Sequence, residues 1–308
     1  MKKIIIATIL TCLVLSTSSV SAIFSSNSTN NFSFEASIIN FSKEKWVVII
    51  CGGADPNSPE GKAGPIPIRN TSRHAYETFK LLGYDDDHIY YLHDNNYSAE
   101  GADDIVSRIN IRNAFTEWLA SHSDENDECC IVFIGHGGPF LLSIWNYEDE
   151  IAEFIFAAEF AAWINTVESN LTTIIIDACF SGSLISSLSK ENRIIITGTS
   201  PLSPGLALFE LVFSYHFFNK LSKNISYGKA WEHADKQISR RNISDIMPNL
   251  GGNLWDKLIL YIKIKLGTFM QNPKIDDNGD RKGRGTLWAD NLPIKGDGNL
   301  ALDTYPKY

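Results

Sequence analysis

Residues 174–183 read IIIDACFSGS, so three isoleucines lead directly into an aspartate, a cysteine and a short Ser-Gly-Ser segment. A run of β-branched residues that gives way to small polar ones is typical of a buried strand ending near Asp177. In open parallel sheets, ligands bind beyond the carboxyl ends of the strands. Asp177 and Cys179 therefore stand where a functional site is expected.

Similar apolar runs lie on both sides of this stretch, and helix-like segments separate them. The predicted strands are 46–51, 89–92, 130–134, 173–176 and 194–197, and the predicted helices are 71–82, 111–121, 157–168, 205–221 and 227–240. The strands are too continuously apolar for a half-exposed sheet, so both faces should be covered. The alternation predicts an α/β fold, a three-layer sandwich with a mostly parallel sheet between helices.

A histidine follows the predicted strand 130–134, within Gly135-His136-Gly137-Gly138. The strand ends should bring the imidazole of His136 and the thiol of Cys179 to one edge of the sheet, on neighbouring strands. A thiol becomes a useful nucleophile near neutral pH when a base lies within reach. Each residue alone has a plainer interpretation, an inert thiol or a structural histidine in a glycine turn, but their shared location favours catalysis.

Composition and the other cysteines exclude several classes of function. The formal net charge of -9 leaves no broad basic surface, which argues against nucleic-acid binding. Cys51, Cys129 and Cys130 belong to apolar runs and lack metal-site spacing, so we interpret them as small buried hydrophobic residues. Cys129 and Cys130 are adjacent and should point to opposite faces of a strand.

The first 22 residues have the pattern of a signal peptide. Lys2 and Lys3 are basic, residues 4–15 are apolar, and small residues at 20–22 provide a cleavage site. An uncleaved anchor is the alternative interpretation. Residues 23–308 contain no apolar run long enough to cross a bilayer, so we expect an exported protein without a membrane span after cleavage.

Two segments resemble the motifs of the caspase-like clan of cysteine peptidases: FIGHGG at 133–138 and DACFSGS at 177–183. They are most similar to the legumain type, the asparaginyl endopeptidases, in its prokaryotic secreted branch. The stretches WVVIICGG at 46–53, RHAYETFKLLGYDDDHIYYL at 73–92 and ITGTSP at 196–201 support the resemblance, which covers about residues 45–240. Metacaspases have a similar cysteine motif. The resemblance implies a caspase-like fold.

The resemblance also implies roles for individual residues. Cys179 matches the nucleophile and His136 the catalytic histidine, while the backbone amides of Gly137 and Cys179 match the oxyanion hole. Asp177 matches an acidic wall of the specificity pocket, which in legumains is a glutamate paired with an arginine.

Arg69 and Arg73 are the candidates for that arginine. If either reaches Asp177, the pocket offers a donor and an acceptor, which suits the carboxamide of asparagine. Asp177 alone would instead attract Lys or Arg. We favour cleavage after Asn and keep a metacaspase-like preference for Lys or Arg as the alternative.

These observations predict an exported cysteine endopeptidase that acts on peptide or protein substrates through a Cys-His dyad and needs no cofactor. A caspase-like domain that binds peptides without turnover is the competing function. The predicted organisation is a signal peptide at 1–22, a flexible Ser- and Asn-rich leader at 23–43, a peptidase domain at 44–245, and a C-terminal extension at 246–308. That extension should contain an amphipathic helix with Leu254, Leu258, Ile262, Leu266 and Phe269 on one face.

The tail contains one weak metal motif. Asp276, Asn278 and Asp280 have the spacing of the first three ligands of a calcium loop. Arg281 stands where a glycine is expected, and Leu287 where the closing acid is expected. We interpret the segment as a plain turn, with a calcium site as the alternative.

Overall fold

A computed structural model of the chain describes residues 20–22, 36–38, 43–53, 57, 65–94, 99–203, 213–239, 271–285 and 293–308. The chain divides into two compact units, Met1–Lys43 and Glu44–Tyr308. In the first unit, β1 (Val20–Ala22) pairs antiparallel with β2 (Ala36–Ile38). Most of the predicted signal peptide and leader, and the amphipathic helix predicted around 254–269, lie outside the described residues.

The second unit is built on a seven-stranded sheet with the strand order β12-β11-β10-β6-β3-β4-β5. Its strands are β3 (Lys45–Cys51), β4 (Ile89–His93), β5 (Asp104–Ile105), β6 (Glu128–Ile134), β10 (Leu171–Asp177), β11 (Arg193–Thr197) and β12 (Lys274–Asp276). All neighbouring pairs are parallel except β11 and β12. The five predicted strands are confirmed.

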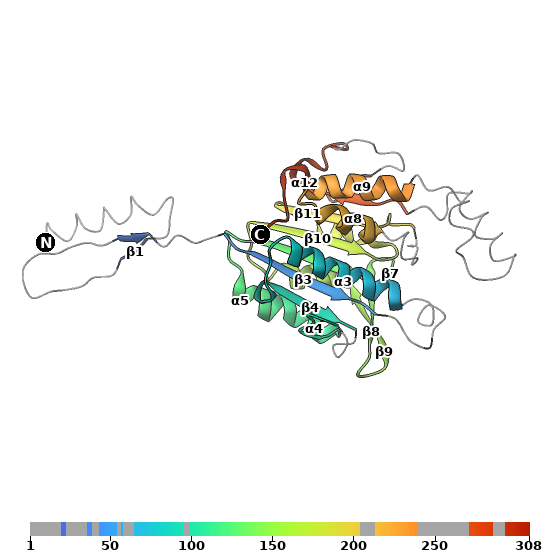
Figure 1. The fold of residues 1–308 in the computed structure, drawn as a ribbon. Helices are drawn as coiled ribbons and strands as arrows, with labels where there is room; N and C mark the ends of the chain where they lie inside the picture. The colour runs from blue at the N-terminus through green and yellow to red at the C-terminus, as the bar shows by residue number, and fades with distance from the viewer. Residues whose placement is uncertain are drawn as a thin grey trace, which may run out of the picture. The chain divides into compact units, whose positions relative to one another are not determined.

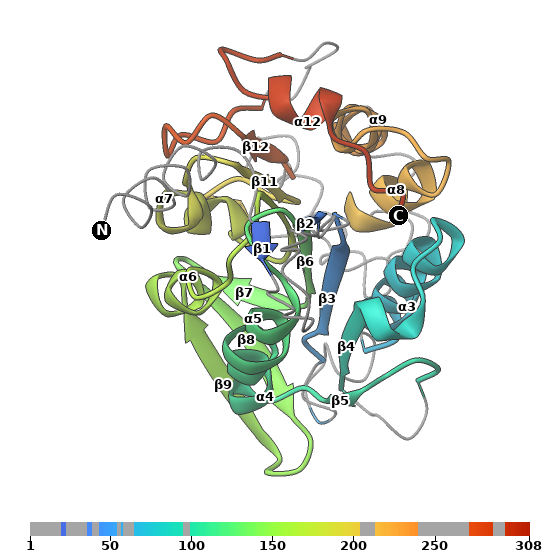
Figure 2. The same cartoon turned by 90° about the vertical axis from the view of Figure 1, so that its left-hand side faces the viewer.

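Helices cover both faces of this sheet, as Figures 1 and 2 show. One face packs against α3 (Pro65–Leu81), α8 (Phe213–Leu221) and α9 (Tyr227–Ser239). The other face packs against α4 (Arg108–Asn113), α6 (Ala157–Ile164) and α7 (Ile185–Leu188). Shorter helical elements include η1 (Asp86–His88), η3 (Ser181–Leu184) and α12 (Asn299–Asp303). The predicted α/β three-layer sandwich is confirmed.

The alternation of side chains along the central strands explains why the sheet has two apolar faces. Val47 and Ile49 of β3 belong to one core, and Val48 and Ile50 belong to the other. Cys129 and Cys130 likewise point into opposite cores, and both are buried. The interpretation of these cysteines as small hydrophobic residues is confirmed.

The helix predicted over 111–121 is confirmed, and its middle part, η2 (Ala114–Leu119), is a π-helical segment between α4 and α5 (Ala120–His122). The residues after β6, which were not predicted to form a strand, make β7 (His136–Gly138), and β7 forms a small antiparallel sheet with β8 (Leu141–Asn146) and β9 (Ile151–Phe156). Glycine is depleted in strands, so the sequence did not indicate this one.

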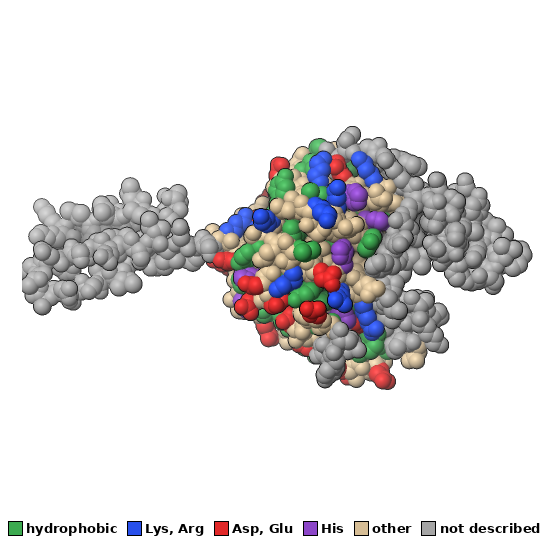
Figure 3. All heavy atoms as spheres, viewed as in Figure 1, with side chains coloured by type: hydrophobic (Ala, Val, Ile, Leu, Met, Phe, Trp, Pro, Cys, Tyr) green, Lys and Arg blue, Asp and Glu red, His purple; other side chains and the backbone are tan. Residues whose placement is uncertain are grey.

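The charged side chains that Figure 3 displays are mixed in sign. Lysine and arginine lie between aspartate and glutamate over the face shown. The exposed ion pair Arg73–Glu77, with a distance of 2.9 Å from Nε to Oε1, belongs to this pattern.

Candidate active site

The two motifs predicted to meet do lie side by side at the carboxyl edge of the sheet. β6 and β10 are neighbours, and Ile134 pairs with Asp177 at the end of the ladder. Beyond this pair, Gly135 N donates a hydrogen bond to Asp177 O at 3.1 Å. His136 and Cys179 follow these residues, and both are half-buried. The expectation that they follow neighbouring strands, β6 and β10, to one edge of the sheet is confirmed.

Gly137 is packed against the backbone of the cysteine. A Cβ atom at this position would lie 2.7 Å from Cys179 O and 3.1 Å from Ala178 Cβ. Any larger residue would force the two strand ends apart. The glycine therefore allows the segment that carries His136 to approach the segment that carries Cys179.

The backbone turns sharply immediately after the cysteine. Phe180 has a φ of 57°, in the left-handed region that residues with a side chain seldom adopt. Its N–H donates to Ser203 O at 2.9 Å. Because the chain leaves the strand at this turn, the Cys179 side chain stays half-buried instead of continuing into the core.

Thr199 connects this turn to the loop after β11. Its Oγ1 donates to Ala178 O at 3.0 Å and accepts from Ser181 N at 3.0 Å. Its carbonyl oxygen accepts from Gly182 N at 3.1 Å. A Cβ on Gly182 would lie 2.7 Å from Pro201 N, so this position also requires glycine.

Sequence reasoning did not identify Thr199 as a site residue. The segment ITGTSP contributed only to a family resemblance, although a threonine just beyond a buried strand is a signal of the same kind as Asp177 and Cys179. Thr199 is fully buried, and its contacts make it a positioning residue for the segment that holds Cys179.

The sequence suggested that Asp177 projects into an open cleft, but in the structure it does not. It is buried, and its Oδ2 accepts from Ser214 N at 2.7 Å and from Ser214 Oγ at 2.5 Å, both at the start of α8. Burial raises the pKa of Asp177, and the hydrogen bonds from Ser214 act in the opposite direction. Gly198 leaves room for this carboxylate, because a Cβ there would lie 2.5 Å from Oδ1.

The two candidate arginines have other partners. Arg69 Nε lies 2.6 Å from Asp94 Oδ2, and Arg73 pairs with Glu77 on the surface of α3. Within the described residues, the hydrogen bonds of Asp177 go to Ser214. The expected pairing of either arginine with Asp177 is therefore wrong. Asp94 is the partner of Arg69 because it directly follows β4, next to the helix that carries the arginine.

Asp94 organises a second polar cluster at the same edge of the sheet. Its side chain is fully buried, and its Oδ1 lies 3.0 Å from His93 Nδ1 and 3.9 Å from Cys51 Sγ. Arg69 also donates from Nη2 to Tyr147 Oη at 3.1 Å. Burial, followed by the charge of Asp94, raises the pKa of Cys51 to about 12.

Backbone contacts connect the second cluster to the first. Gly52 lies against Gly135, since a Cβ on Gly52 would be 3.2 Å from Gly135 Cα. Gly53 lies against Asp94 and Tyr147. The strand ends of β3, β4, β6 and β10 thus form one continuous edge, with Arg69 bonded to Asp94 beyond β4 and Asp177 at the end of β10. Sequence reasoning missed Asp94, although an acid directly after a predicted strand was the available signal.

Residues 112–206 match the model of the Peptidase C13 family. This range includes β6, β10 and both motif residues, His136 and Cys179. The match supports the predicted cysteine peptidase, an enzyme that acts on protein substrates.

Among solved structures, the chain is similar to caspase-1 from Spodoptera frugiperda. The sequence identity is 10% and the TM-score is 0.49, and the similarity covers 76% of this chain and 86% of that chain. No curated protein matches the sequence. Among the described residues, every helix is too short or too polar to cross a membrane.

Proposed function

We propose that the protein is an exported cysteine endopeptidase in which Cys179 is the nucleophile and His136 is the general acid and base. One observation carries the proposal. The backbone after β6 and the backbone after β10 are held together by the Gly135–Asp177 hydrogen bond and by the contact of Gly137 with Cys179. The Peptidase C13 match over the same residues supports it.

In the proposed reaction, the Cys179 thiolate attacks the carbonyl carbon of the scissile peptide bond. The N–H groups of Gly137 and Cys179 stabilise the oxyanion that forms. His136 gives a proton to the leaving amine, and a thioester remains on Cys179. Water, deprotonated by His136, then attacks the thioester carbonyl and restores the thiol. No metal or organic cofactor is needed for these steps.

The Asp177 carboxylate is no third member of this dyad in the proposal. It lies on the same strand as the nucleophile, and its bonds go to Ser214. We assign it a structural role, in which it connects the end of β10 to the start of α8. This differs from the pocket wall that the resemblance implied.

For substrate preference, the proposal retains asparagine but changes the pair of residues that recognises it. Arg69 is about one-third exposed and is neutralised by the buried Asp94, so the pair offers donors with little net charge. A neutral carboxamide suits such a surface better than a lysine or arginine side chain does. Metacaspase-like cleavage after Lys or Arg stays the alternative.

Export is proposed from the signal-like residues 1–22 alone. Mass spectrometry of the protein expressed in a bacterial host should find an N-terminus near Ile23 outside the cytoplasm. A cytoplasmic product that retains residues 1–22 would contradict it.

The function is tested by adding a peptide with an electrophilic ketone after its Asn residue to the full-length protein. Labelling should occur on Cys179, identified by mass spectrometry, and Cys179→Ala should prevent it. A domain that binds peptides without turnover would bind the unmodified peptide but neither react with the ketone nor cleave the peptide.

The pocket assignment is tested with a peptide library and two arginine variants. Arg69→Ala should lower the rate of cleavage after Asn, while Arg73→Ala serves as the matched control because Arg73 pairs with Glu77 on the surface. Strong cleavage after Lys or Arg that neither substitution affects would overturn the Asn assignment.

A further inference from the structure

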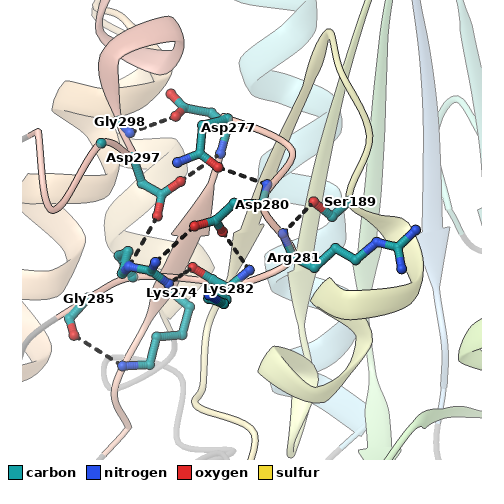
Figure 4. Close-up of polar contacts among 12 residues, drawn as sticks. Ser189, Lys274, Asp277, Asp280, Arg281, Lys282, Gly285, Asp297 and Gly298 are labelled. Atoms are coloured by element: carbon teal, nitrogen blue, oxygen red, sulfur yellow. Dashed lines mark hydrogen bonds and ion pairs between the residues drawn. The ribbon is translucent and has the colours of Figure 1, made fainter.

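Three carboxylates from the C-terminal part of the chain meet beside the edge of the sheet. Asp276 ends β12, Asp280 lies in the turn that follows, and Asp297 comes from a later segment. One side-chain oxygen from each lies within 4.8 Å of one from each of the others. Figure 4 shows Asp280 and Asp297 facing the same space.

Two of these carboxylates are deeply buried and incompletely bonded. Asp276 is 1% exposed and Asp297 is 0% exposed. In the described part of the chain, both carboxylate oxygens of Asp276 and Oδ2 of Asp297 have no hydrogen-bond partner of normal geometry. Burying a carboxylate without donors costs several kcal/mol, so native proteins rarely leave one in this condition.

The neighbouring Asp277 is also a buried acid, and backbone N–H groups of the same C-terminal region donate hydrogen bonds to it. Its Oδ1 accepts from Gly298 N at 2.8 Å, and its Oδ2 accepts from Ala301 N at 2.9 Å, at the start of α12. Asp277 is thus fully bonded by the protein, whereas Asp276, one residue earlier, is not. The Ser189 side chain and the backbone N–H groups of Asn278 and Gly279 lie near the Asp276 carboxylate, but none of them makes a hydrogen bond of normal geometry with it. The Asp276 oxygens can therefore still accept a ligand.

Among the residues that the structure describes, Arg284 is the cation that reaches the cluster. Arg284 Nη2 lies 2.8 Å from Asp280 Oδ2, and Arg284 Nε lies 3.9 Å from Asp297 Oδ2. Lys274 instead donates to Gly285 O at 3.1 Å, as Figure 4 shows. Among the described residues, one guanidinium faces three carboxylates, two of them buried and Asp280 exposed, which leaves an excess of negative charge.

The donor atoms indicate the class of ligand. Calcium binds six to eight oxygen atoms at about 2.3–2.6 Å, so two oxygens on one ion lie at most about 5 Å apart. The carboxylate separations meet this condition. Asp297 also supplies the acid that the sequence motif lacks at Leu287. Carboxylate oxygens alone are unsuited to zinc or copper, which prefer nitrogen and sulfur.

We propose that Asp276, Asp280 and Asp297 form a calcium site that ties the segment around Asp297 to β12. β12 pairs with β11 through Asp276 and Ile195, so the ion would hold the C-terminal segment on the edge of the central sheet. The site is separate from His136 and Cys179, and its role is structural.

The test uses the full-length protein after treatment with a chelator. Adding CaCl₂ should raise the midpoint of thermal unfolding by several degrees and give a saturable heat of binding in calorimetry. Asp297→Asn and Asp276→Asn should abolish both effects. Asp303→Asn is the matched control, because Asp303 is an exposed acid on nearby α12, and it should keep them.

Three outcomes would overturn the proposal. The first is a wild-type midpoint that calcium does not change, without heat of binding. The second is an equal calcium response in Asp297→Asn and in the wild type. The third is an equal effect of MgCl₂ at the same concentration, which would indicate non-selective screening of charge. None of these readouts depends on peptidase activity.

Discussion

Two pairs of neighbouring strand ends in this molecule each carry a cysteine, a histidine and an aspartate. At the ends of β6 and β10 these are Cys179, His136 and Asp177, and at the ends of β3 and β4 they are Cys51, His93 and Asp94. The first cysteine and histidine are half-buried, whereas Cys51, His93 and Asp94 are buried. Residue type and strand-end position are therefore insufficient to define a reactive site.

The environment of the aspartate explains much of the difference. Asp94 pairs with the Arg69 guanidinium and lies beside the Cys51 thiol, so its negative charge opposes formation of a thiolate there. Asp177 is turned away toward Ser214 at the start of α8. The two clusters differ in which group each acid faces, and this difference can be tested.

The largest expected effect concerns the two cysteines. Cys179→Ala should reduce peptide hydrolysis by about 10³-fold or more, because it removes the proposed nucleophile. Cys51→Ala should leave kcat/KM almost unchanged and lower the free energy of unfolding by about 1 kcal/mol. Initial rates and urea unfolding of both variants provide the measurement. Equal loss of activity in the two variants would remove the distinction between the clusters.

The next effect concerns Asp94. Asp94→Ala should lower the free energy of unfolding by about 2–3 kcal/mol, because Arg69 loses its partner in a largely dry environment. The figure is below that for a fully buried pair, since Arg69 is partly exposed. Asp87→Ala, at an exposed position, is the control. If both variants unfold at the same urea concentration, the Arg69–Asp94 pair is not what stabilises the second cluster.

A smaller effect is expected at Thr199. Thr199→Val preserves shape but removes the bonds to Ala178 O and Ser181 N, so kcat should fall by about tenfold while KM changes little. Thr166→Val, which removes an exposed hydroxyl bonded to Trp163 O, should change neither constant. A rise in KM with constant kcat would assign Thr199 to substrate binding instead of the positioning of Cys179.

The smallest effect concerns the alkylation of Cys51, which should not begin as the pH is raised from 8 to 10. Because the pKa of Cys51 is raised to about 12, its thiol stays protonated between pH 8 and pH 10 in the folded protein. The stability linked to this neutral thiol is complete below about pH 8.5 and is lost as the pH rises through about 12. Iodoacetamide should therefore leave Cys51 unlabelled in the native protein across this range, while it labels Cys179. Appearance of label on Cys51 in native protein at pH 10 would contradict its closed environment.

The sequence was sufficient to predict the sheet and the principal pair of residues. The runs 46–51, 130–134 and 173–176 are apolar on both faces, which only a doubly covered strand requires. Once these strands are parallel neighbours, His136 and Cys179 must lie at one edge. Both inferences depend on residues close together along the chain.

The contacts that the sequence did not reveal join residues with no pattern in common. Ser214 bonds to Asp177 from the start of a distant helix, and Asp94 takes the arginine that was assigned to Asp177. An acid beyond one strand and an arginine on a nearby helix have many alternative partners, and local periodicity does not select among them. The β7 strand was missed because Gly137 and Gly138 are equally suited to a turn.

The pairing of β12 with β11 has a consequence for the order in which the chain assembles. A strand at the edge of a sheet exposes a row of unpaired N–H and C=O groups, which a second chain can extend into an aggregate. β11 is synthesised well before Lys274–Asp276, and at about 5–20 residues per second its outer edge stays open for several seconds. A chain that ends before Lys274 would keep that edge open permanently. Pairing with β12 covers the outer edge of β11 once the C-terminal segment is in place.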